Sequence, residues 1–168
     1  MSVLPIRLFP DPVLKSRAEE IVEINGELQT LADNMAQTMY KAPGLGLAAN
    51  QVGVLRRLIV VDVGHREKKP DLKVIINPCI THGEGEIIHN EGCLSVRDFS
   101  AEVRRYARVG ITGLDRHGNP LELEAEGLLA IVLQHEIDHL NGMLFIDRIS
   151  RLKRGLYIRR LKKQAAAR

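Results

Sequence analysis

Hydrophobic residues recur at helical spacing in two stretches of the chain. In residues 28–39 a Leu or Met returns every three or four positions, and residues 128–140 repeat Leu, Ile and Val in the same way. This period describes one face of an α-helix. Asn25 is a favoured N-cap ahead of the first stretch, which Pro43 ends, and Asn141-Gly142 is a favourable C-cap after the second. The pattern therefore predicts an early amphipathic helix and a late one.

Between these helices the pattern changes to that of β-strands. Short runs rich in Val and Ile, or alternating apolar and polar residues, predict strands. The predicted strands are 58–63, 74–76, 84–88, 101–106, 108–114 and 120–126. Asn77-Pro78 is expected to end the second of them, and residues 115–119 to form a hairpin turn. The order of helices, strands and helices predicts an α+β fold, with antiparallel sheets packed around helix 128–140.

The length of the chain and the distribution of its charges predict a single domain with a basic C-terminal end. The 168 residues are the length of one domain, so we expect 1–168 to form a single domain. Residues 151–168 hold eight of the 24 Lys and Arg and none of the 21 Asp and Glu, so the rest of the chain is net acidic. We expect about 150–168 to be a basic C-terminal helix. Either an anionic partner or a solvated helix face explains such a segment.

The N-terminal residues and the apolar runs point to a cytoplasmic protein. Residues 1–10 lack the apolar core of a signal peptide, and no apolar run approaches the ~20 residues that span a bilayer. We expect no membrane and no DNA as partners. In a reducing compartment a disulfide between Cys79 and Cys93 is not expected. Cys79, beside Pro78 in a strand-like segment, is expected to be a small buried residue.

The strongest chemical signal is His135-Glu136-Ile137-Asp138-His139, an H-E-x-x-H motif inside the late predicted helix. Residues four apart share a helix face, so both imidazoles can bind one metal ion while Glu136 acts as acid and base. The alternative is two surface histidines on an amphipathic helix. It is disfavoured because Leu128, Ile131 and Val132 make the same face apolar, and buried histidines need a partner.

The third metal ligand distinguishes the possible enzyme classes. A metzincin needs a third His at position 145, which is Phe, and no Glu follows for a thermolysin-like site. Asp147 is the only downstream carboxylate, so a zinc endopeptidase using it remains one alternative. Cys93 in Glu91-Gly92-Cys93-Leu94-Ser95 is the upstream candidate, because a thiolate is a strong ligand for such ions. An RNA-binding or ribosome-binding module with a structural metal is the non-enzymatic alternative.

A third segment, GLGLAANQ at 44–51, places two glycines before small residues. It lacks the spacing of a phosphate-binding loop. The glycines indicate that some group approaches the backbone closely. Gln51 supplies a neutral donor that could stabilise an oxyanion.

Together, GLGLAANQ at 44–51, EGCLS at 91–95 and HEIDH at 135–139 resemble the three motifs of the peptide deformylase family, in the same order. The resemblance covers nearly the whole chain and is closest to the bacterial type. It implies an α+β fold and removal of the N-formyl group from the initiator methionine of nascent polypeptides. The chain departs from many members after EGCLSV, where Arg97 stands in place of Pro. This departure affects the shape of that loop and the preference beyond the first substrate residue.

The resemblance also assigns roles to individual residues. It implies that Cys93, His135 and His139 bind one divalent metal ion, most readily Fe(II), with Zn, Ni or Co as substitutes. The Leu94 N–H would help Gln51 to hold the oxyanion. The substrate, an N-formylmethionyl nascent peptide, would pair with Leu45-Gly46 like an added strand, and Gly92 permits close approach.

Helical spacing, independently of the resemblance, nominates Leu128, Ile131 and Val132 as the wall of the methionine pocket. The basic segment 151–168 is expected to hold the enzyme near ribosomal RNA, through contacts that weaken as salt rises.

Overall fold

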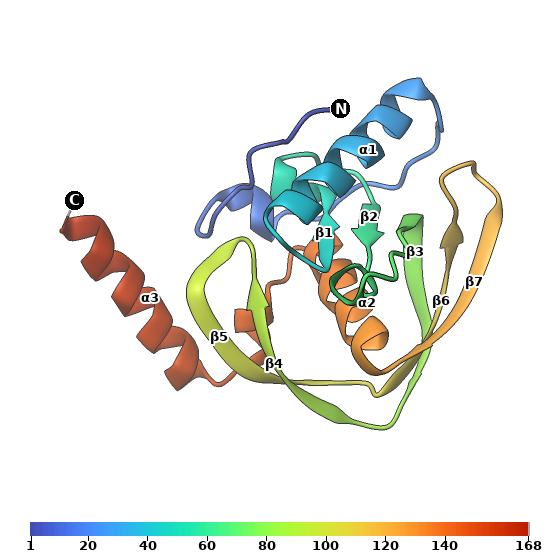
Figure 1. Ribbon diagram of the computed structural model, residues 1–168. Coiled ribbons are helices and arrows are strands. Elements are labelled where there is room, and N and C mark those ends of the chain that lie inside the picture. The colour runs from blue at the N-terminus through green and yellow to red at the C-terminus, as the bar shows by residue number, and fades with distance from the viewer. Residues whose placement is uncertain (168) are drawn as a thin grey trace.

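The computed structural model describes residues 1–167 and contains two antiparallel sheets and three α-helices (Figure 1). The larger sheet has the strand order β1-β2-β3-β6-β7, and the smaller one pairs β4 with β5. The strands are β1 (Gly46–Ala48), β2 (Leu58–Val61), β3 (Lys73–Glu84), β4 (Ile87–Cys93), β5 (Val96–Arg105), β6 (Arg108–Leu114) and β7 (Pro120–Glu126). The helices are α1 (Gly26–Lys41), α2 (Gly127–Leu140) and α3 (Arg151–Ala166). Short 3-10 turns cover Pro12–Lys15, Ala49–Val52, His65–Glu67 and Phe145–Arg148.

The larger sheet is covered by a helix on each face. Side chains alternate between the two faces of a strand, so neighbouring residues of β2 enter different cores. Ile59 and Val61 pack with α2, whereas Leu58 and Val60 pack with α1. Because both faces are covered, all four residues of β2 are buried. Figure 1 shows α2 at the centre of the molecule, with the β4–β5 hairpin on its other side.

The α+β fold with antiparallel sheets, expected from the sequence, is confirmed. The Asn25 side chain accepts a hydrogen bond from the Leu28 N–H at 3.0 Å and so caps α1. The late helix lies where the pattern placed it, and Gly142 follows its end with φ of +76°. A left-handed residue at this position is the usual termination that glycine permits.

Two expectations for β3 are wrong. The strand does not end at Asn77-Pro78 but continues to Glu84, because a register shift between Ile76 and Cys79 absorbs the proline. Asn77 adopts φ of +51° in this irregularity. The bulge also changes which residues of the strand face the core, and Cys79 is exposed rather than buried.

Helix α3 projects away from the body of the protein, as Figure 1 shows. Its Tyr157 and Leu161 nevertheless pack into a hydrophobic cluster with Val103 of β5 and Phe145. The expected basic C-terminal helix is therefore present, although Arg168 lies outside the described residues. Within residues 1–167, no helix is long and apolar enough to cross a membrane.

Candidate active site

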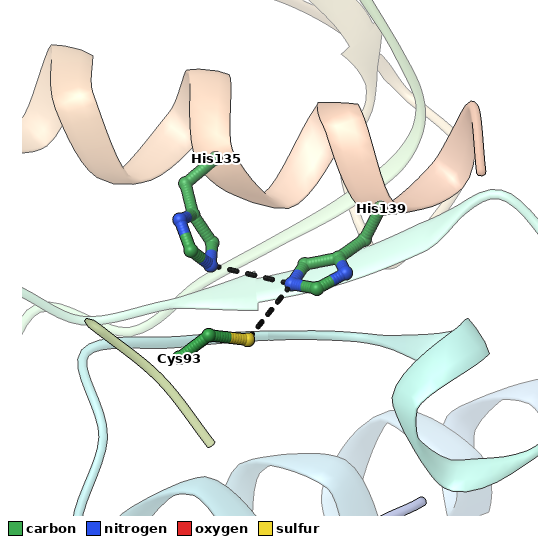
Figure 2. Close-up of side chains that lie close together, drawn as sticks. All are labelled: Cys93, His135 and His139. Carbon is green, nitrogen blue, oxygen red and sulfur yellow. Dashed lines mark hydrogen bonds between the residues drawn. The ribbon is translucent and has the colours of Figure 1, made fainter. Parts of the chain in front are cut away.

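Cys93, His135 and His139 bring three potential ligand atoms together (Figure 2). The Sγ of Cys93 lies 3.4 Å from Nε2 of His139, which lies 3.2 Å from Nε2 of His135. All three atoms lie within 4.8 Å of one another. The group can therefore bind one metal ion.

The three ligands come from two elements that meet above the larger sheet. His135 and His139 lie one turn apart on α2, so both rings point to the same side of the helix in Figure 2. Cys93 is the last residue of β4 and pairs with Val96. Hydrogen bonds join the β4–β5 hairpin to α2, from His135 to Glu91 and from Arg105 to Asp138.

The hydrogen bond between Nδ1 of His135 and Glu91 leaves the other ring nitrogen, Nε2, able to bind a metal ion. Burial alone would raise the pKa of Glu91, but hydrogen bonds from Arg105 and His135 lower it to about 2. Glu91 is therefore an acceptor, and the Nδ1–H of His135 must donate to its Oε1 at 2.9 Å. The Nε2 of His135 is then the nitrogen that faces the other ligand atoms and that a metal ion would bind.

The other two ligands are consistent with a cation at this point. Burial lowers the pKa of His139 well below its ordinary value, which favours the neutral imidazole that binds metals. Ligands about 2.0 to 2.3 Å from a tetrahedral ion lie roughly 3 to 4 Å apart. The distances of 3.4 Å from Cys93 to His139 and 3.2 Å from His139 to His135 match that range. Two imidazoles and a thiolate that converge in this way fit a divalent ion of the Fe or Zn kind.

Behind His135, a buried network of charged side chains holds Glu91 in place. Arg105 donates to both oxygens of Glu91 at 2.7 and 2.8 Å, and to Asp138 at 2.6 Å. Arg148 donates to both oxygens of Asp138 at 2.6 and 2.8 Å. The network thus runs from the segment after α2, through β5, to the outer nitrogen of His135. It fixes the orientation and tautomer of that ring.

Glu136 lies beside the three ligands. It is 3% exposed, and its Oε2 has no hydrogen-bond partner within residues 1–167. Burial raises the pKa of Glu136 to about 7. A Cβ atom on Gly46 would lie 2.7 Å from Oε1 of Glu136, so only glycine fits there without moving the carboxyl group. The close approach predicted for the GLG segment is thus made by Glu136.

Gln51 points its amide donor at the same place. The Ala48 N–H donates to Oε1 of Gln51 at 3.0 Å, so the NH2 group faces the other way. That NH2 group lies 3.6 Å from Sγ of Cys93 and donates to Oγ of Ser95 at 3.1 Å. The carboxamide is buried and its orientation is set by the turn that follows β1.

A cleft of about 920 Å³ opens beside these residues. It runs between β1 and the β4–β5 hairpin, and α2 forms its floor. Leu94, the second expected oxyanion donor, lines the cleft, as does every substrate-binding residue expected from the sequence: Leu45, Gly46, Gly92, Leu128, Ile131 and Val132. Ile131 and Val132 are buried, whereas Leu128 is 40% exposed at the mouth.

Comparisons with known proteins agree with this geometry. The family model described as polypeptide deformylase matches residues 3–155. The peptide deformylase of Thermodesulfovibrio yellowstonii is 58% identical over 162 residues, covering 96% of this chain and 98% of that protein. The chain belongs to the peptide deformylase family. A second relative, the peptide deformylase of Desulfosudis oleivorans, is 51% identical over 165 residues. The match covers 98% of this chain and 95% of that protein.

Solved structures of deformylases share the fold. A peptide deformylase from Legionella pneumophila superposes with a TM-score of 0.91 at 44% identity, covering 99% of this chain and 97% of that one. A peptide deformylase from Synechococcus elongatus, in complex with actinonin, superposes with a TM-score of 0.90 at 39% identity. The match covers 95% of this chain and 88% of that one.

The geometry argues against the two alternatives to a deformylase. Asp147, the third ligand of the endopeptidase alternative, is instead bound by Lys15 and by the Leu144 N–H at 2.9 Å. A structural metal would need a closed set of ligands, whereas Cys93, His135 and Glu136 all line an open cleft.

Sequence reasoning missed Arg105 and Arg148 as parts of the deformylase site. Arg105 lies inside a predicted strand, and Arg148 lies between helix 128–140 and the basic end, so neither has a distinctive spacing. One local signal was available. Arg105 occupies an inward-facing position of a strand with alternating burial, where a charged side chain is unusual.

Proposed function

We propose that Cys93, His135 and His139 hold one divalent metal ion and that Glu136 serves as the acid and base of a deformylation reaction. Membership of the family gives the reaction, which is hydrolysis of the formyl amide at the N-terminus of nascent polypeptides. The observation that carries the residue assignment is the convergence of the three ligand atoms beside a buried, unpartnered carboxylate. The products are formate and a polypeptide with a free amino group on methionine.

The ion proposed is Fe(II), with Zn, Ni or Co able to occupy the same ligands. One thiolate and two neutral imidazoles suit any of these ions. When bound, such an ion supplies Lewis acidity that polarises the formyl carbonyl and acidifies water. A thiolate and Fe(II) are both oxidised by air, so we expect an iron-loaded site to lose activity aerobically.

Glu136 carries the protons of the reaction. Its pKa of about 7 allows it to accept a proton from the attacking water and later to deliver one to the departing amine. The Gln51 NH2 group, which is turned toward Cys93, and the N–H of Leu94, which lines the cleft, would donate to the developing oxyanion. Removal of one such donor typically costs about 3 kcal/mol of transition-state stabilisation.

The substrate is proposed to add a strand to the free edge of β1. Leu45 accepts a hydrogen bond from the Asp62 N–H at 2.9 Å, so its polar groups face β2. Antiparallel pairing alternates, so the N–H and C=O of Gly46 face the cleft. An extended peptide can pair with both groups and keep its formyl end beside Glu136.

The methionine side chain is proposed to enter the apolar part of the cleft. Ile131 and Val132 lie one turn before His135 and Glu136 on α2 and form its inner wall, with Leu128 at the mouth. Leu45 and Leu94 border the same space. A wall built from branched aliphatic side chains favours an unbranched apolar group of the size of methionine.

The basic helix α3 is proposed to bring this cytoplasmic enzyme to the ribosome. It projects from the body and carries no acidic residue, which suits contact with phosphates (Figure 1). Deletion of residues 151–168 should abolish co-sedimentation with ribosomes, and raised salt should weaken it in the full chain. Unchanged co-sedimentation of the truncated protein at low salt would refute the proposal.

The activity is tested by formate release from a formyl-Met tripeptide, with anaerobically purified, Fe(II)-loaded protein. Glu136→Ala should retain the metal and lose at least about 100-fold in kcat. Glu122→Ala, an exposed carboxylate on β7, is the matched control and should keep full activity. Cys93→Ala should lose the metal. Normal turnover by Glu136→Ala, or tight metal binding by Cys93→Ala, would contradict the assignment.

A further inference from the structure

The part of the cleft beyond the methionine pocket is bordered by two arginines from opposite walls. Arg66 lies in the turn that follows β2, and Arg97 lies near the start of β5. Both line the cleft and both are exposed. Among residues 1–167, neither of them has an ion pair or a side-chain hydrogen bond to another residue. Each guanidinium is therefore available to a ligand in the cleft.

Opposing charges near these arginines are few. Three carboxylates line the cleft, but Glu91 and Glu136 are buried and Glu91 is bound by Arg105. Asp98 is the exposed one, next to Arg97 in sequence. The rim therefore carries two exposed arginines against one exposed carboxylate.

The register of β1 places both arginines downstream of the reacting bond. Gly46 contacts Glu136, so the formyl end of the substrate lies there. A strand that leaves this point toward Gly44 runs antiparallel to β1. Because Leu45 is bonded to Asp62, the chain that follows Asp62, including Arg66, extends past the Gly44 end. Across the cleft, the side chain of Leu94 approaches Gly44, and Arg97 follows three residues later.

The segment that carries Arg97 has an unusual backbone. Cys93 pairs with Val96 and Glu91 pairs with Ala101, so residues 97–100 lie opposite Gly92 alone. This four-residue bulge begins at Arg97, and Asp98 adopts φ of +57° within it. The bulge turns its residues toward the cleft.

Both arginine-bearing segments are held by contacts behind them. The carboxylate of Asp62 accepts hydrogen bonds from the N–H groups of Gly64 and Asp71, each at 3.1 Å, and closes the turn around Arg66. On the other side, Phe99 packs on Tyr157 of α3 with ring centroids 4.6 Å apart, and Arg160 donates to the Asp98 carbonyl at 2.6 Å. The backbone under each arginine is therefore anchored, although the side chains are exposed.

We infer that Arg66 and Arg97 select substrates, favouring formyl-methionyl peptides with an acidic side chain at the second or third residue. The inference rests on the proposed function and on the direction of the substrate strand. Alternate side chains of an extended peptide face opposite walls, so a carboxylate at one of these two positions can reach each arginine. Because the contacts form with the bound substrate as well as in the transition state, the preference should appear in KM rather than in kcat.

The test measures kcat/KM for peptides that differ in one charge. Formyl-Met-Glu-Ala and formyl-Met-Ala-Glu are compared with their Gln and Lys counterparts, all as C-terminal amides. Exposed ion pairs contribute about 0.2 to 1 kcal/mol each, so Glu should exceed Gln by about 1.4- to fivefold, and Lys should be the poorest. The Glu preference should shrink when salt rises from about 0.02 to about 0.5 M, because salt screens exposed charges.

Three variants locate the preference. Arg66→Ala with Arg97→Ala should bring the Glu to Gln ratio to about one, and Arg97→Lys should keep part of it. Arg104→Ala, which removes an exposed arginine of β5 that pairs with Glu86, should keep the full ratio. Equal kcat/KM for Glu and Gln peptides in the unaltered protein would overturn the inference, as would a preference that persists in the double variant. Neutral peptides test the proposed function separately, since failure to deformylate them would refute that function alone.

Discussion

Arg105 is predicted to be the most important single cation for the stability of this protein. Its side chain is 2% exposed and bridges Glu91 and Asp138, which are nearly as buried. Replacement by Met keeps an unbranched side chain of similar length but removes the charge. Glu91 would then keep only His135 as a partner, and Asp138 only Arg148. Buried carboxylates that lose a partner are strongly destabilising.

The expected magnitude follows from two independent routes. Breaking a buried pair by removing one partner costs about 3 to 5 kcal/mol. Against the effect of burial, Arg105 and His135 together lower the pKa of Glu91 from 4.5 to about 2, which corresponds to about 3 kcal/mol of favourable interaction at about 1.4 kcal/mol per pH unit. For a chain of this size, that loss should lower Tm by about 6 to 20 °C.

Arg104 provides the matched control. It is the neighbouring residue on β5, but its side chain is 73% exposed and pairs with an exposed Glu86. Arg104→Met should change stability by no more than about 1 kcal/mol. Equilibrium unfolding in urea, at one metal loading for all variants, measures both effects. Loss of less than about 1 kcal/mol in Arg105→Met, with an unchanged m-value, would refute the reasoning.

A double-mutant cycle separates the charge from the packing. Arg105→Met alone leaves the carboxylate of Glu91 without its main partner. Combining it with Glu91→Gln removes that carboxylate. The double variant should be more stable than the sum of the single changes predicts, by at least about 1 kcal/mol. Strict additivity would mean that Arg105 stabilises the protein through its packing alone.

The remaining predictions concern acid, the GLG segment and α3. The favourable contribution of Glu91 is fully present above its ordinary pKa of 4.5 and should be lost as pH falls toward about 2, which acid titration of unfolding free energy would detect. Gly46→Ala should lower kcat by displacing Glu136, whereas Gly155→Ala, which meets no atom within 4 Å, should leave kcat unchanged. Tyr157→Ala should cost roughly 3 kcal/mol of stability and raise KM by loosening the bulge at Phe99, while the same change at the exposed Leu156 should cost less than about 0.5 kcal/mol.

Features that depend on neighbouring residues were predictable from the sequence. The helix that carries His135 and His139 follows from its apolar period and its Asn-Gly ending, and its two ligands follow from a four-residue spacing. The N-cap of α1 at Asn25 is equally local. The three-residue β1 was not predicted, because a strand this short shows no period.

Features that depend on long-range pairing were not predictable. The bulge after Asn77 is stabilised by β2 and β6 on either side of β3, so the proline does not end the strand. The exposure of Cys79 follows from that bulge and not from its neighbours in sequence. In the same way, the partner of Glu91 is 14 residues away and that of Arg105 on α2 is 33 residues away. No spacing rule connects them.

The three sequence motifs depend on long-range contacts that the sequence does not reveal. Each motif has a local reason for its residues: Gly46 leaves room for Glu136, Cys93 ends a strand, and α2 aligns its histidines. None of these reasons brings β4 to α2. Arg105 does so, because it bonds Glu91 on β4 and Asp138 on α2 at once. Glu91 then orients the His135 ring toward Cys93 two residues further along β4. The ligand geometry is therefore a consequence of one buried arginine between two elements of the fold.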